Sequence, residues 1–298
     1  MATTVDNDAL SVPAGRGRMA LPGVGPTLGL ICLTAVAVMT LFAPWLSPHG
    51  PLVQNLGDIA KPPTISLHGF GPYPLGTDEL GRDLLSRVMF GSRTIVVICT
   101  VAVVVGGGVG SIAGMLAGYA GRWVDALTMR LVDVQLTMPA ILLALTLIAV
   151  LGANTGNLII VLALTGWPSY ARVVRAEVLS VRQREFVQAA DQFGGSSFYV
   201  ITRHILPNVM GTIVVLASLD FGRVALVESA LSFLGLGVQP PTPDWGAMLA
   251  SGSQYLSTAW WIPTMPGVAL TMLILGVNLV ADWLRDMLNP RIQTGQIP

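Results

Sequence analysis

Charged residues are scarce in this sequence. Only 11% of its 298 residues are Asp, Glu, Lys or Arg, whereas 53% are hydrophobic and the mean hydropathy is +0.69. Soluble domains carry about 25% charged residues, so a water-soluble fold of this length would have too few charges to cover its surface. The deficit indicates that much of the surface faces lipid. The formal net charge of zero provides no field that would attract nucleic acid as a partner.

Lysine is nearly absent, and this excludes one kind of ATP-binding site. The single lysine, Lys61, follows Ala60 and precedes Pro62. A P-loop needs a glycine-rich turn followed by Gly-Lys-Ser/Thr, so we expect no ATP hydrolysis by this chain alone. No Ser-His-Asp pattern stands out, and His204 is interpreted as a solvated or interface residue. We expect a chain that is no enzyme and binds no cofactor itself.

Cysteine is also scarce. Cys32 and Cys99 each lie inside an apolar run, and two cysteines are too few for a disulfide framework or a cysteine zinc site. They are interpreted as small buried hydrophobic residues. The three histidines have no metal-site spacing, so no metal site is predicted.

The hydrophobic residues are concentrated in six runs. A membrane helix needs roughly 20 mostly apolar residues. The runs lie at residues 27–46, 94–118, 132–152, 156–171, 209–235 and 262–284. The third contains Pro139 and the fourth Pro168, and each proline permits a bend. The sequence therefore predicts an all-α membrane protein with six transmembrane helices.

Basic residues predict the orientation of these spans. With a cytoplasmic N-terminus, eleven arginines fall in inside segments, four basic residues fall outside, and Arg223 lies within a span. The outside residues are Lys61, Arg82, Arg87 and Arg93. We therefore expect both termini in the cytoplasm, with an N-terminal tail at 1–26 and a C-terminal tail at 285–298. The polar residues 1–18 do not resemble a cleaved signal peptide.

Two large segments are predicted outside the membrane. Residues 47–93 form the extracytoplasmic segment, which is rich in Pro and Gly, and Leu80, Leu84 and Val88 recur at a spacing of four. That spacing predicts an amphipathic helix over 78–90. Residues 172–208 form the inside segment and hold five arginines.

Small residues line one face of the second span. Gly106, Gly110, Gly114 and Gly118 are each four apart and let another backbone approach closely. One interpretation is helix packing within the chain. The other is a face that slides or pivots when a channel changes state.

The fifth span contains Asp220, Arg223 and Glu228. Charges there are costly, so they should face the protein interior or water. Asp220 and Arg223 are three apart and can pair, whereas Glu228 lies on a different face. In one interpretation, Asp220 and Arg223 are a structural ion pair and Glu228 lies near the outer boundary. In the other, these residues line a pore whose positive and negative charges would suit a peptide.

The inside segment predicts two short helices. In the first, an apolar stripe is formed by Phe186, Ala189, Ala190 and Phe193. Gly194 and Gly195 end that helix, because glycine readily takes a left-handed conformation. Ser196 can cap the second helix, and Pro207 marks its end or a bend. Such a stripe fits either a partner groove or the membrane surface.

Five ordered motifs resemble the C-type permease subunit of dipeptide and oligopeptide importers of the binding-protein-dependent ABC class. The first is A-A-x-x-x-G followed by I-x-x-x-I-L-P-N, which begins at Ala189 and ends at Asn208. The others lie at 74–87, 118–125, 230–246 and 284–291, so the resemblance covers residues 25–291. The family usually has glutamate where Gln188 stands, which puts in doubt any role that needs a carboxylate there.

The resemblance implies a type I ABC importer permease fold in the cell inner membrane. Residues 185–197 would form the coupling helix, which docks on an ATPase subunit through Glu185, Phe186, Gln188, Ala189, Ala190, Phe193 and Gly194. One or two ATPase subunits would bind ATP and Mg, and a homologous second permease would complete the channel. A substrate-binding protein would deliver peptide at the outer segments 47–93 and 236–260.

Alternative functions remain open at this stage. The same architecture could import nickel, glutathione or another small solute. An ion-coupled secondary transporter would be expected to show inverted repeats or interrupted helix pairs, and no such pattern is seen. A membrane-embedded enzyme would need catalytic groups facing each other from two spans, whereas the ionisable residues cluster in the fifth.

Overall fold

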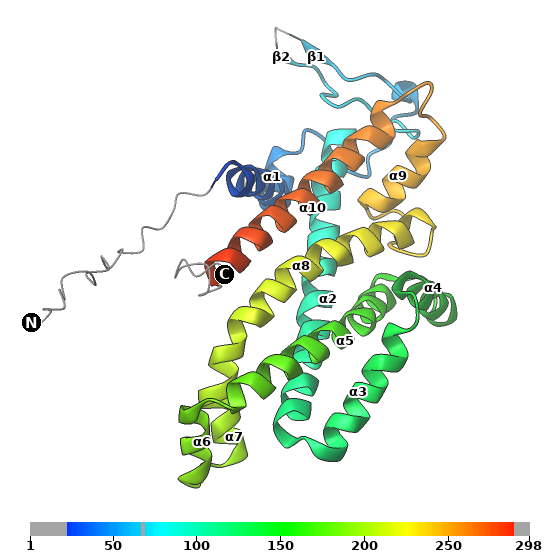
Figure 1. Cartoon of the computed structure of the whole chain (residues 1–298). Coiled ribbons are helices and arrows are strands. Elements are labelled where there is room, and N and C mark those ends of the chain that lie inside the picture. Colours follow the sequence, from blue (N-terminus) through cyan, green and yellow to red (C-terminus); the bar gives the residue numbers. More distant parts are fainter. Residues whose placement is uncertain (1–22, 67–68, 289–298) are drawn as a thin grey trace, which may run out of the picture.

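The computed structural model describes residues 23–66 and 69–288, and these are almost entirely helical (Figure 1). Five helices are long and apolar enough to cross a membrane. They are α1 (Val24–Leu46), α2 (Leu84–Ala120), α5 (Thr155–Arg182), α8 (Leu206–Phe233) and α10 (Trp261–Leu288). Most of the predicted tails, at 1–22 and 289–298, lies outside the described residues.

A bent pair of helices raises the number of candidate spans among the described residues from five to six. α3 (Arg122–Leu136) and α4 (Ala140–Leu151) meet at 90°, and together they pass the same test of length and hydropathy. Pro139 lies at the N-cap of α4, because proline has no N–H to donate and disfavours helix in the residue before it. The bend expected there is confirmed, but the helix before it begins well ahead of residue 132. Pro168, by contrast, lies inside the continuous helix α5.

The predicted amphipathic helix at 78–90 is wrong over residues 78–83, which form a turn, whereas residues 84–90 are helical as the first part of α2. The Asp78 carboxylate accepts hydrogen bonds from the backbone N–H groups of Leu80 and Arg82, and Gly81 has a φ of +70°. That turn cannot continue a helix. Asp83 caps α2, which runs unbroken from Leu84 into the membrane span. The non-helical part of this segment therefore ends at Asp83, and the residues from Leu84 to position 93 belong to α2.

Short elements occupy the two ends of the molecule. The outer segment contains a 3₁₀ turn at Leu56–Asp58 and the antiparallel strands β1 (Ile65–Ser66) and β2 (Gly69–Phe70). At the opposite end lie α6 (Glu185–Gln192) and α7 (Ser197–Val200), and a π-helix (Ile201–Ile205) joins α7 to α8 (Figure 1). α9 (Trp245–Ser253) lies between α8 and α10 in the sequence.

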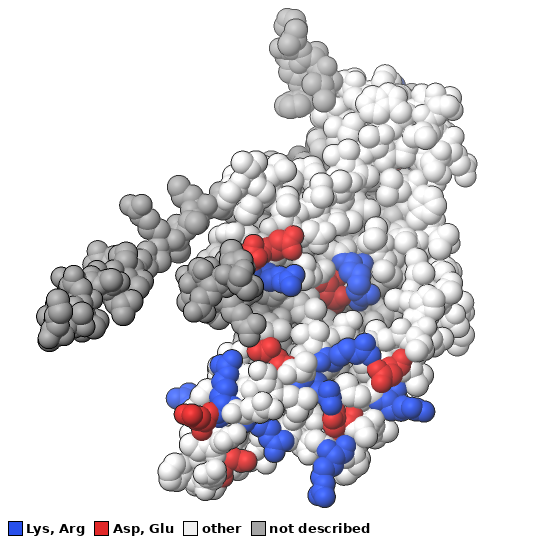
Figure 2. Space-filling model, viewed as in Figure 1, with Lys and Arg blue, Asp and Glu red and all other residues white. Residues whose placement is uncertain are grey.

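Charged side chains gather at the α6 end of the visible face, around α6, α7 and the neighbouring ends of α3 and α5 (Figure 2). The part of this face nearer the β1–β2 strands is almost free of charge in the same view. On this face, the charged side chains are therefore concentrated toward the α6 end.

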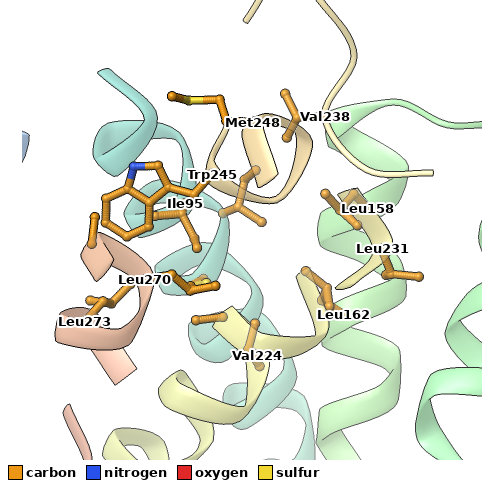
Figure 3. Packing of buried hydrophobic residues seen from close by; sticks show 14 of the residues in the cluster. Ile95, Leu158, Leu162, Val224, Leu231, Val238, Trp245, Met248, Leu270 and Leu273 are labelled. Atoms are coloured by element: carbon orange, nitrogen blue, oxygen red, sulfur yellow. The ribbon is translucent and has the colours of Figure 1, made fainter. Parts of the chain in front are cut away.

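The main core lies where α2, α5, α8, α9 and α10 meet. Trp245 of α9 is fully buried there, near Ile95 of α2 (Figure 3), and its indole Nε1 donates to the Val88 carbonyl at 2.9 Å. Cys99 is buried in this core as expected, whereas Cys32 on α1 is half-buried. A second cluster fixes the inner end of α5 to the start of α8.

Candidate coupling surface and translocation path

α6 is attached to the molecule by its smaller apolar residues. Val187 is 1% exposed and packs with Val174, Val178 and Val181 of α5 in the second cluster. Ala190 lies partly buried against the same cluster. α6 therefore presents its other side to the surroundings.

The turn after α6 is a Schellman motif. Gly194 has a φ of +83°, and its N–H donates to the Asp191 carbonyl at 3.1 Å. The N–H of Gly195 donates to the Ala190 carbonyl, also at 3.1 Å. This pattern ends a helix and reverses the chain, as the two glycines predict. Ser196 then caps α7 by accepting from the N–H of Tyr199.

The large side chains of the predicted stripe point outward. Phe193 is 92% exposed and Phe186 is 44% exposed, with the half-buried Ala189 between them. We call Phe186, Ala189 and Phe193 the α6 surface. The predicted stripe is therefore divided, because Ala190 packs against the chain while the α6 surface is open.

Sequence reasoning missed two aromatic residues beside the α6 surface. Phe198 and Tyr199 of α7 are 78% and 51% exposed. The His204 ring lies 5.4 Å from the Tyr199 ring and 6.3 Å from the Phe186 ring. The signal was available, because Ser196 as a helix cap places both aromatic residues in the first turn of α7.

The polar residues of α6 make few contacts within the chain. The Gln188 amide donates to the Gln183 carbonyl at 3.3 Å, and Glu185 is exposed in the first turn. A glutamate carboxylate at position 188 could not donate to the Gln183 carbonyl. Gln188 therefore has a local hydrogen-bond partner that the usual glutamate would lack.

A polar network joins α6 to the inner end of α2. The Tyr119 hydroxyl of α2 donates to the Asp191 carboxylate at 3.2 Å. The Arg182 guanidinium of α5 donates to the Tyr119 carbonyl at 2.8 Å and lies 5.3 Å from its ring. These residues line a cleft of about 420 Å³ between α6 and the ends of α2 and α5.

The glycine face of α2 packs against α5. An added Cβ at Gly106 would meet the Ala163 carbonyl at 2.7 Å, and one at Gly114 would meet the Ala171 carbonyl at 2.5 Å. Gly110 and Gly118 face α5 in the same way. The interpretation as packing within the chain is confirmed, because α2 and α5 touch backbone to backbone along this face.

Asp220 and Arg223 form the expected pair in α8. The Arg223 Nε donates to Asp220 Oδ1 at 2.7 Å, and the Tyr170 hydroxyl of α5 donates to Oδ2 at 3.2 Å. Asp220 is buried, whereas the Arg223 side chain is 37% exposed. The Arg223 Nη2 has no hydrogen-bond partner among the described residues. Arg223 is thus oriented by Asp220, and its Nη2 is buried while other parts of the side chain remain exposed.

Glu228 does not face a pore. It is fully buried, and the Ser232 and Ser229 hydroxyls donate to its two carboxylate oxygens at 2.9 and 3.2 Å. Its neighbour is Asp244, the N-cap of α9. The prediction of a pore-lining Glu228 is wrong, because the loop after α8 folds back over it.

Comparison with known proteins finds matches to two families of membrane transport components. Residues 110–294 match the model of the family "Binding-protein-dependent transport system inner membrane component", and residues 27–63 match "N-terminal TM domain of oligopeptide transport permease C". These two matches cover most of the chain.

Among individual relatives, the chain is 40% identical to the di/tripeptide transport system permease protein DppC of Pseudomonas aeruginosa, over 89% of this chain and 88% of the relative. It is 39% identical to the dipeptide transport system permease protein DppC of Escherichia coli, over 90% of each. It is also 39% identical to the probable D,D-dipeptide transport system permease protein DdpC of Escherichia coli, over 88% and 86%.

Proposed function

The chain belongs to the family of binding-protein-dependent transport system inner membrane components, and from that premise we propose that it is a permease subunit of an ATP-driven peptide importer. The relatives named above are di-, tri- or D,D-dipeptide permeases, which favours a peptide over nickel or glutathione. The chain would form half of the channel, with a homologous permease as the other half.

The observation that carries the proposal is the α6 surface. Phe186 and Phe193 are large apolar side chains held in water beside a small alanine, which is costly unless a partner covers them. Aromatic anchors around a small residue suit a groove on a partner. An ATPase subunit would fill this role, and one or two such subunits would supply the ATP and Mg that this chain does not bind.

Movement of α6 would reach the spans through contacts already in place. Val187 links α6 to α5, and the Asp191–Tyr119–Arg182 network links it to α2. The backbone contact of α2 with α5 makes these two helices one stiff unit. A push on α6 would therefore tilt α2 and α5 together and alternate the access of the channel.

The charge distribution supports a cytoplasmic location for α6. The arginine-rich end of the molecule carries α6 (Figure 2), and such ends remain on the cytoplasmic side. Both termini would then be cytoplasmic in the inner membrane. The β1–β2 end would face the substrate-binding protein that delivers the peptide.

Arg223 is the residue we assign to the translocation path. Its side chain is 37% exposed, although one guanidinium nitrogen, Nη2, is buried without a hydrogen-bond partner among the described residues. A peptide carboxylate passing this point would accept a charge-assisted hydrogen bond. Asp220 would act as the positioning residue, since it is buried and holds the Arg223 Nε.

Co-purification tests the role of the α6 surface. Ala189→Arg places a long charged side chain between the two aromatic anchors, and Phe193→Ala removes one anchor from an exposed site. Both should retain a folded permease, because neither residue is fully buried. Loss of an anchor costs about 2 kcal/mol or more at an interface centre, so F193A should lower ATPase affinity by roughly 30-fold or more.

The control is Phe42→Ala on α1, which removes an aromatic side chain that is 46% exposed, about as exposed as Phe186, and lies far from α6. ATP hydrolysis that purifies with the tagged chain should survive F42A and be lost with A189R. If A189R and F193A retained the ATPase subunit as well as F42A does, the α6 surface would not be the docking site.

A further inference from the structure

Two carboxyl groups meet in the core beneath the outer loops. Glu228 lies near the end of α8, and Asp244 is the N-cap of α9. Both are fully buried, and the first turn of α9 packs on α8 at Ser229 and Ser232, which brings the two carboxyl groups next to each other. Sixteen residues separate them in the sequence, so tertiary folding alone brings them together.

Every carboxylate oxygen of the pair except one has a donor. Ser232 and Ser229 donate to Glu228, and the N–H of Ala247 donates to Asp244 Oδ2 at 3.0 Å. Asp244 Oδ1 is buried, and it has no hydrogen-bond donor among the described residues when both carboxyl groups are ionised. A buried acceptor without a donor is costly. The arrangement therefore indicates that one of the two carboxyl groups carries a proton, which the ionised forms lack.

In the part of the chain that the structure describes, no basic side chain is among the groups that interact with the pair. From α2, the buried Cys99 thiol interacts electrostatically with both carboxyl groups. The charged residues of α10, which are Asp282, Arg285 and Asp286, lie in its last turns, whereas α9 packs on its first turns through Gly252 and Pro263. Two adjacent buried negative charges cannot both persist without a cation.

We propose that Glu228 and Asp244 share one proton at neutral pH, and that the resulting O–H···O bond fastens α9 to the end of α8. One carboxyl group keeps the proton and donates it to the other, which satisfies Asp244 Oδ1. The bond holds α9 in register, so that Trp245, the next residue, seats its indole on the Val88 carbonyl of α2. The pair thus positions the outer loop region independently of the function proposed above.

The proton makes the stability of this region depend on pH. Burial raises the pKa of the Asp244 carboxyl above its ordinary value. The folded state therefore retains a proton that the unfolded chain releases above about pH 4. Stability from this source is complete below the unfolded pKa and declines as pH rises toward the folded pKa, by up to about tenfold in the unfolding equilibrium constant per pH unit.

Infrared spectroscopy and pH-dependent melting of the full-length chain in lipid nanodiscs test the proposal. Glu228→Gln and Asp244→Asn each replace the shared proton by an amide hydrogen, and asparagine remains a good helix cap. Both variants should lose one carboxylic-acid carbonyl band at neutral pH. Both should also lose the decline in melting temperature that the pair causes as the pH rises above about 4. Asp282→Asn, the same change at an exposed carboxylate of α10, should leave both readouts unaltered.

The outcomes separate clearly. E228Q keeps the Asp244 cap, so it serves even if D244N folds poorly. If E228Q folds and retains the acid band and the wild-type pH slope, no proton is shared and the proposal fails. Loss of the band with a flattened slope supports it.

Discussion

A methyl group added at Gly110 tests the contact between α2 and α5. Its carbon would lie 2.3 Å from the Trp167 carbonyl oxygen and 2.7 Å from the Tyr170 Cβ. Ordinary contacts begin near 3.4 Å, so the helices would have to separate by roughly 1 Å. Because protein interiors are close-packed, the separation would loosen neighbouring contacts along the helix pair.

Gly108 provides the matched control on the same helix. A methyl group there would meet nothing within 4 Å. Both Gly→Ala changes gain about 0.8–1 kcal/mol of helix propensity, and this gain cancels when the two variants are compared. The remaining difference is the cost of overpacking, about 1–3 kcal/mol. We expect G110A to be less stable than G108A by that amount.

Reversible unfolding of the two variants in mixed micelles measures this difference, with tryptophan fluorescence as the signal. G108A should be at least as stable as the unchanged chain. If G110A matched G108A in unfolding free energy, α2 and α5 would not be in backbone contact, and the stiff unit in our mechanism would be lost.

Two further predictions concern buried charges. In transport assays, the double variant D220N/R223Q should assemble normally but import a peptide with a free carboxylate roughly tenfold or more slowly, because a charge-assisted hydrogen bond is worth about 1.5–3 kcal/mol. Equal slowing of a peptide with an amidated C-terminus would contradict a role for the carboxylate. In unfolding assays, Asp78→Asn should destabilise the chain by about 3–5 kcal/mol, because Arg82 and Arg87 lie buried within 2.7 and 3.2 Å of that carboxylate. An unchanged stability would show that this ion cluster contributes little.

Hydropathy predicted the membrane spans because crossing lipid is a local requirement. Each span must be apolar over its own length, whatever it packs against. The glycine spacing in α2 and the pairing of Asp220 with Arg223 are local for the same reason, since one helix turn brings both sets onto one face. The Schellman turn at Gly194 likewise depends on neighbours in sequence.

The turn at residues 78–83 was predicted as helix because the spacing of apolar residues conflicts there with a glycine turn. Leu80, Leu84 and Val88 have helical spacing, yet Gly81 adopts a positive φ and an added Cβ there would lie 1.9 Å from the Asn55 carbonyl oxygen. The chain at Asn55 passes too close for any side chain. Asp83 before an apolar run was a cap signal that would have placed the helix start correctly.

By itself, the sequence determined that the chain crosses a membrane, that a short helix begins at Glu185, and which family motifs the chain carries. That helix ends at Gln192, so the predicted bounds 185–197 are too long at their end. The tertiary structure decided which of the polar residues are accessible. Arg223 remains partly open, whereas Glu228, five residues further along α8, is enclosed by a loop that brings Asp244 to it. Burial depends on chain segments distant in sequence, and periodicity within one helix carries no information about them.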